Sequence, residues 1–188
     1  MLDKFTINNI KSDSLQFGLA LTLSHIFAGK NFIKDNYFHI KSIFLTIIGF
    51  ATFHLLISKL FNIKNLNPHT RITVEDILKF STMLIVSKFF INRNRLKNKN
   101  FILSGINLII SFFIYDSIIL KNYTYKLIKP HMNINQILAI NDMAKFGFVL
   151  LFTEVLDSLS NKENINFEYI RLTVGYITGL VLYDLYLI

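Results

Sequence analysis

The stretch DMAKFG, residues 142–147, stands at the start of a long apolar segment, and two similar stretches stand at the start of other apolar segments. DILKFS at 76–81 and DSLQFG at 13–18 keep its aspartate and the phenylalanine four places later. Lysine precedes the phenylalanine in two of the stretches and glutamine in the third, and glycine or serine follows it. The three stretches align without gaps, which indicates an internal repeat.

The second half of each repeat is marked by an aromatic residue followed by a polar one. These pairs are Phe53–His54, Tyr115–Asp116 and Tyr183–Asp184, and they follow the three aspartates at distances of 41, 40 and 42 residues. We therefore predict three tandem helix-hairpin repeats. They cover approximately 13–62, 74–124 and 138–188 of a single domain that spans 1–188.

The composition indicates that lipid surrounds much of the chain. It is 52% hydrophobic and 17% charged, with a mean hydropathy of +0.44, whereas soluble domains carry about 25% charged residues. Too few polar side chains are present to coat a water-soluble fold of this size. Six apolar runs have about the 20 residues that a helix needs to cross a bilayer, and they lie near 14–33, 38–61, 74–92, 100–120, 134–158 and 167–188.

The predicted fold class is an all-α membrane protein. Its six transmembrane helices would form three tandem hairpins with approximate threefold pseudo-symmetry. The first, third and fifth runs are more polar than the others. The alternative is therefore a chain with four spans and additional amphipathic helices that lie at the membrane interface.

Charges open the odd-numbered runs. We interpret the acids as favouring the positive N-terminal end of each helix and the lysines as reaching toward lipid headgroups. An Asp and a Lys three residues apart on a helix can also pair locally. The residues given this role are Asp13, Asp76, Lys79, Asp142 and Lys145.

Other polar residues fall within the apolar runs. Ionisable residues inside a membrane are costly and usually face the interior of a helix bundle or a water-filled cavity. The candidates for a polar pathway or buried polar group are His54, Asp116, Asp184, Lys88, Glu154 and Asn107. The alternatives are a place in the interfacial aromatic belt for the YD pairs, an ion pair between Lys88 and Glu154, and a bond between helices for Asn107.

Two further features concern the packing of the helices. Helical periodicity places Asn107 roughly on the face of its helix opposite Asp116. Gly175 and Gly179 are four residues apart, a spacing that allows membrane helices to approach closely.

Several chemistries are excluded or disfavoured. The chain has no cysteine, which excludes disulfides, zinc–thiolate sites and a thiol nucleophile. No phosphate-binding glycine loop, metal-binding histidine motif or nucleophile motif is present. We therefore expect no catalytic residue, cofactor or metal, and no enzymatic activity.

The net charge of +8 lies mostly in the short connectors between the runs. Basic connectors beside apolar helices are expected to meet anionic lipid headgroups, and no nucleic acid is expected. The abundance of Ile, Asn, Lys and Phe indicates an AT-rich genome.

The function expected from the sequence is that of a multi-pass membrane protein without enzymatic activity. It would be a structural or assembly component of a cellular, organellar or virion membrane, with lipid, other membrane proteins or copies of itself as partners. The alternative is a small ion or proton channel or transporter that uses its intramembrane ionisable residues, because internal repeats are common in transport folds.

Overall fold

The computed structural model describes residues 4–29, 36–57, 60, 68–91, 99–162, 164–165 and 167–187. Within these ranges the chain is almost entirely helical and contains no strand. The predicted all-α class is therefore confirmed.

Six helical rods account for the described chain. The first four are α1 (Lys4–Phe27), α2 (Asn36–Thr52) with its π-helical extension η1 (Phe53–Ile57), α4 (Pro68–Ile91) and α5 (Lys99–Ile114). The α5 rod continues through the π-helical η4 (Tyr115–Thr124) into α6 (Tyr125–Leu127), and α7 (Ile134–Asn161) and α8 (Phe167–Tyr186) follow. The rods match the six predicted runs in order.

Local signals explain the start of two helices. The helix α4 begins at Pro68, because the first turn of a helix tolerates a residue that has no backbone N–H to donate. At the start of α7, Asn133 accepts a hydrogen bond from the Gln136 backbone at 2.8 Å, and the Gln136 side chain accepts one from the Asn133 backbone at 3.0 Å. This reciprocal capping satisfies two N–H groups that the helix itself leaves unpaired.

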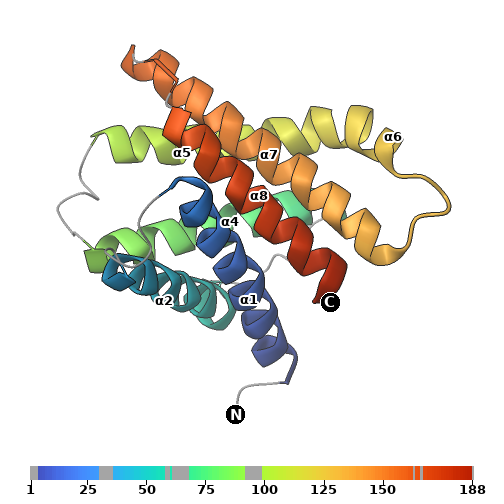
Figure 1. Ribbon diagram of the computed structural model, residues 1–188, viewed down its shortest axis with the longest axis horizontal. Coiled ribbons are helices and arrows are strands. Elements are labelled where there is room, and N and C mark those ends of the chain that lie inside the picture. The colour runs from blue at the N-terminus through green and yellow to red at the C-terminus, as the bar shows by residue number, and fades with distance from the viewer. Residues whose placement is uncertain are drawn as a thin grey trace.

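The six rods close into a ring. Each packs against the rods before and after it in the sequence, and α8 packs against α1 to complete the circle. The α1–α8 contact is the most extensive and the α4–α5 contact is the smallest of these six. Figure 1 shows α8, in red, between α1 in blue and α7 in orange, as the contacts require.

Two glycines allow the close approach of α8 to α1. A Cβ added to Gly179 would lie 2.4 Å from the Cα of Ala20, and one added to Gly175 would lie 2.5 Å from the carbonyl oxygen of Leu23. Both distances are far shorter than a carbon contact, which has its optimum near ~3.5–4.0 Å. These glycines, four residues apart as noted in the sequence, therefore pack within the chain against its first helix.

Among the described residues, two helical segments are long and apolar enough to cross a bilayer by length and composition. They are Asn100–Leu120 and Ile134–Asn161, and Ile43–Ile57 is a shorter apolar helix.

Candidate functional site

Charged and polar side chains from all six rods meet at one end of the bundle. We call this set the polar ring, and it lies in three clusters around the axis. Its members are Asp13, Gln16, His54, Asp76, Lys79, Asp116, Asp142, Lys145 and Asp184.

The first cluster joins α1, η1 and α4 around Asp13. The Oδ2 atom of Asp13 lies 2.7 Å from Nε2 of His54 and 3.1 Å from Nζ of Lys79. All three side chains are largely buried, with exposed fractions of 14%, 8% and 15%. A carboxylate removed from water needs such partners, since an unpaired buried charge is strongly destabilising.

The second cluster joins α4, η4 and α7 around Lys145. The Nζ atom of Lys145 donates to Oδ2 of Asp76 at 2.5 Å and lies 3.8 Å from Oδ1 of Asp116. Asp116 is only 1% exposed and Lys145 only 6%. One buried ammonium thus serves two carboxylates from neighbouring helices.

The third cluster joins α7, α8 and α1 around Gln16. The Nε2 atom of Gln16 donates to Oδ2 of Asp142 at 2.7 Å and to Oδ1 of Asp184 at 3.2 Å. An uncharged amide therefore occupies the place that an ammonium has in the second cluster. Asp184 is 1% exposed, and its Oδ2 atom has no hydrogen-bond partner in the described part of the chain.

The contacts among α1, α4 and α7 form a closed cycle. The acid of α1 pairs with Lys79 of α4, the acid of α4 pairs with Lys145 of α7, and the acid of α7 pairs with Gln16 of α1. Each acid thus bonds to the residue that aligns with lysine on the next helix rather than on its own. The local Asp–Lys pairs expected within a helix are replaced by contacts between helices.

The role predicted for the charges at helix starts is accordingly wrong. The helices begin at Lys4, Pro68 and Ile134, two turns or more before the aspartates. Asp13, Asp76, Lys79, Asp142 and Lys145 therefore lie within the helices and face the bundle axis, where they cannot cap an N-terminus. The physical reason is that polar residues ahead of each apolar run join the helix as well.

An aromatic layer lies directly beside the polar ring. Phe17, Phe80 and Phe146 each follow the glutamine or lysine of the ring in sequence. Their ring centroids are 5.2 Å, 5.2 Å and 5.7 Å apart, and each pair meets edge to face at 67° to 83°. Such arrangements place the positive edge of one ring against the negative face of another.

This layer fills the centre of the bundle. The three rings have exposed fractions of only 5% to 6%. Phe50 of α2 stacks on Phe17, and Phe112 of α5 stacks on Phe80. Every one of the six rods contributes to the buried cluster around them, so the layer separates the polar ring from the rest of the bundle interior.

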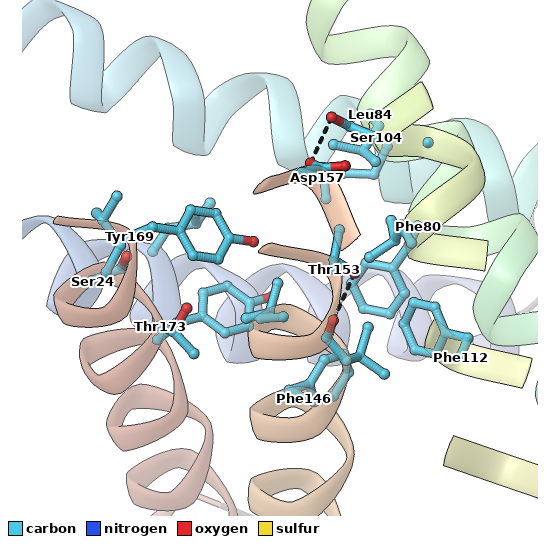
Figure 2. Close-up of a pocket in the computed structure, with 18 of the residues that line it drawn as sticks. Ser24, Phe80, Leu84, Ser104, Phe112, Phe146, Thr153, Asp157, Tyr169 and Thr173 are labelled. Atoms are coloured by element: carbon cyan, nitrogen blue, oxygen red, sulfur yellow. Dashed lines mark hydrogen bonds between the residues drawn. The ribbon is translucent and has the colours of Figure 1, made fainter. Parts of the chain in front are cut away.

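A cavity of about 750 Å³ lies on the other side of the aromatic layer. On α1, α4 and α7 the lining residues lie mostly C-terminal to Phe17, Phe80 and Phe146. On α5 and α8, which run in the opposite direction, they lie mostly N-terminal to Phe112 and Asp184. Asn100 lines the cavity and is exposed, so the cavity reaches the surface there. Figure 2 shows the rings of Phe80, Phe112 and Phe146 together at one side, and Asp157 beside Ser104 at another.

The cavity wall is mostly apolar and aromatic, with a few polar groups. Asp157 is the only acidic side chain among the described residues that line it. Its carboxylate accepts hydrogen bonds from Ser104 Oγ at 2.7 Å and from Asn107 Nδ2 at 2.6 Å. Two bonds from α5 thus hold this negative charge in position in the wall.

The predicted pathway residues are brought together only in part. His54, Asp116 and Asp184 are all buried in the polar ring, whereas Asn107 is buried beside the cavity, where it bonds to Asp157. Glu154 is half-buried on α7. The side chain of Lys88 lies outside the described residues, so its predicted pair with Glu154 stays a prediction.

Both Asn107 and Asp116 are buried, with exposed fractions of 5% and 1%, although α-helical periodicity predicts opposite faces. The rod becomes a π-helix from Tyr115 onward, and its wider turn changes the angular step between side chains. His54 is likewise the second residue of a π-helical segment, η1. Such segments occur often at functional sites.

Sequence reasoning missed Asp157 and the role of the phenylalanine column. This column was visible in the sequence, because Phe17, Phe80 and Phe146 occupy the same place in the three aligned stretches. Asp157 lies near a polar connector and gave no such signal, since its partners are about 50 residues away in the sequence.

Comparison of the chain with protein-family models, curated proteins and solved structures finds no match. Within the described residues, no group of three or more histidine or acidic side chains is arranged to hold a metal ion.

Proposed function

We propose that this protein is an integral membrane transporter that carries a small solute through its central cavity. The observation that supports it best is the order of layers along the axis. The polar ring and the aromatic layer close one end of the bundle, and the cavity lies on the other side with a path to the surface. A closed end beside a solute-sized cavity is the arrangement that alternating access requires.

The distribution of side chains supports a membrane location. Large apolar residues face outward, including Phe113, Phe44 and Leu151 with exposed fractions of 62%, 60% and 40%. Charged residues face inward, with Asp116 and Asp184 at 1%. Soluble proteins bury charges rarely and seldom expose wide apolar surfaces, whereas ionisable residues of membrane proteins face the bundle interior.

Hydroxyl groups of the helices support the same location. Five threonines donate to the carbonyl four residues earlier in their own helix, at 2.6 to 2.8 Å. This bond satisfies the hydroxyl without water, as a side chain in a lipid environment requires.

All six rods would span the bilayer as three tandem hairpins with approximate threefold symmetry. The cyclic contacts of the polar ring and the triangle of phenylalanines support this arrangement, because equivalent residues of the three repeats meet at one level.

The cavity favours a small organic cation as the solute. Its volume of about 750 Å³ is within the range of ~300–1,000 Å³ that is typical of small-molecule sites. Aromatic rings such as Tyr169 and Tyr176 line it together with the Asp157 carboxylate. Aromatic faces and a carboxylate both attract an ammonium group.

The test is uptake of labelled methylammonium, choline and tetraethylammonium by liposomes that contain the purified protein. We expect uptake above that of empty liposomes, and a loss of at least tenfold in Asp157→Asn. Glu168→Gln, a change at an exposed residue outside the cavity, is the matched control and should transport normally.

Two results would count against the proposal. Equal uptake by Asp157→Asn and wild type would contradict the proposal that the solute is a small organic cation. No flux of these cations, or of neutral and anionic solutes of similar size, would remove transport itself and favour the structural or assembly role expected from the sequence.

A further inference from the structure

The third cluster of the polar ring lacks a positive charge that the first two contain. Lys79 contacts Asp13, and Lys145 contacts both Asp76 and Asp116. At the equivalent position of the third cluster, the Gln16 amide donates to two carboxyl groups at once. The side chains of Asp142 and Asp184 also contact each other within hydrogen-bond range, so the two carboxyl groups lie close together.

Two ionised carboxylates in this place would repel each other in a buried environment. The ring as a whole also contains more acids than bases, since five aspartates face two lysines and one histidine. Like charges that share a site favour the state in which one of them holds a proton. An amide is neutral and cannot supply the missing charge.

A specific atom is available to carry that proton. The Oδ2 atom of Asp184 is buried, and no described residue forms a hydrogen bond with it. A carboxylic acid has one O–H donor, while an ionised carboxylate has acceptors only. Protonation of Asp184 at Oδ2 removes one negative charge and leaves Oδ1 free to accept from Gln16.

From this geometry we infer that Asp142 and Asp184 form a binding site for one proton, held by Gln16. Proton binding closes the end of the bundle at the polar ring, because it allows α7 and α8 to meet α1 through the same amide. Proton release leaves two carboxylates that repel each other and separates α8 from α7 at this end. The proton site stands on the contacts alone, whereas its role as a coupling ion rests on the proposed transport function.

Other titratable groups surround this pair in the polar ring. Asp76 and Lys79 on α4, Lys145 on α7 and Tyr176 on α8 interact electrostatically with Asp142. The remaining members contact these or each other: Asp13 on α1 with His54 on η1 and with Lys79, and Asp116 on η4 with Lys145, while Tyr183 on α8 bonds to Ser12. The two lysines favour ionised carboxylates, but each already contacts an acid of its own cluster. Opening is therefore expected as the pH rises through the value at which the pair loses its proton.

The decisive measurement is infrared spectroscopy of the purified protein, with the carboxylic acid C=O band followed as a function of pH. Wild type should show this band at pH 7. Asp184→Asn should lose it, because Asp142 is then ionised and still bonded to Gln16. Gln16→Lys should lose it too, because its ammonium supplies the charge that the other clusters have.

Asp157→Asn is the matched control. Its carboxylate accepts two hydrogen bonds from uncharged groups and faces no second described acid in those contacts, so this variant should keep the band. A change from potassium to sodium salt at constant pH should leave the band unchanged if the ligand is a proton.

The inference is overturned if wild type has no carboxylic acid band at pH 7, or if the band is retained in both Asp184→Asn and Gln16→Lys. A band absent from wild type together with stabilisation by sodium would assign a metal cation to the site instead. The outcome is separate from the transport test. Solute flux without the carboxylic acid band would contradict only the proton site. The band without solute flux would contradict only the proposed transport function.

Discussion

The close contact between α8 and α1 predicts that one added methyl group will separate the first helix from the last. In Gly179→Ala the new Cβ would lie 2.4 Å from Ala20 Cα, 2.8 Å from Ala20 N and 2.9 Å from Leu19 O. All three are backbone atoms, so no side chain can turn away to make room. To reach the ~3.5 Å optimum of a carbon contact, the helices must move apart by about 1.1 Å.

The matched control is Gly105→Ala on α5, where a Cβ would meet no atom within 4 Å. Alanine is a better helix former than glycine by about 1 kcal/mol, and this gain applies to both variants. The difference between them therefore isolates the packing cost, which for overfilling a packed interface is about 1–3 kcal/mol. Gly105→Ala should be more stable than wild type, and Gly179→Ala should be less stable than Gly105→Ala by that amount.

The assay is denaturant unfolding in detergent micelles, followed by circular dichroism, with the free energy of unfolding compared among variants. Gly147→Ala provides an intermediate case, since its Cβ would lie 3.3 Å from the flexible end of Ile177. Its stability should fall between the other two. Equal stability of Gly179→Ala and Gly105→Ala would refute the close α1–α8 contact, and with it the closure of the helical ring.

Three further predictions concern the charges, the lipid surface and the aromatic layer. Lys145→Met leaves Asp76 and Asp116 without their shared ammonium, so denaturant unfolding should show a free energy of unfolding that is lower by about 3–5 kcal/mol. Lys79→Met should lower it by less, because Asp13 keeps its contact with His54. Since the chain has no tryptophan, Phe113→Trp introduces a single fluorophore at a side chain that is 62% exposed. The emission of this tryptophan should be shifted to the blue and quenched by brominated lipid tails. Lys162→Trp, beyond the end of α7, is the control and should show neither effect. A spectrum of Phe113→Trp like that of tryptophan in water would contradict a lipid-facing surface. Phe80→Ala combined with Phe146→Ala removes two of the three central rings, so passive leakage of small solutes through liposomes containing the variant should rise; unchanged leakage would mean that the aromatic layer is no barrier.

Some features of the site could be predicted from the repeat. The aligned aspartates, phenylalanines and aromatic–polar pairs predicted residues at equivalent places in three hairpins. Three of the predicted pathway residues, His54, Asp116 and Asp184, do lie in one buried set. Residues at equal distances along packed helices come to the same level, because the rise per residue of a helix is constant.

The choice of partners could not be predicted in the same way. An Asp and a Lys three residues apart can bond within one helix or to neighbouring helices, and the sequence pattern is the same for both. Only the packing of α1, α4 and α7 around one axis shows that Asp76 bonds to Lys145 rather than to Lys79. The π-helical segment after Ile114 could not be predicted from the sequence pattern either, and it changes the direction of the Asp116 side chain relative to that of Asn107.

The sequence by itself determined the helical class, the order and approximate length of the six rods, and the columns of residues that recur in them. These follow from local properties, namely the spacing of apolar residues and the distances along a helix. The tertiary structure decided that the recurring residues meet as a cycle of contacts, that three phenylalanines separate this cycle from a cavity, and that Gln16 stands between two acids without a cation. Those features depend on contacts between residues as far as 168 positions apart, and which helix faces which is settled only when all six pack together.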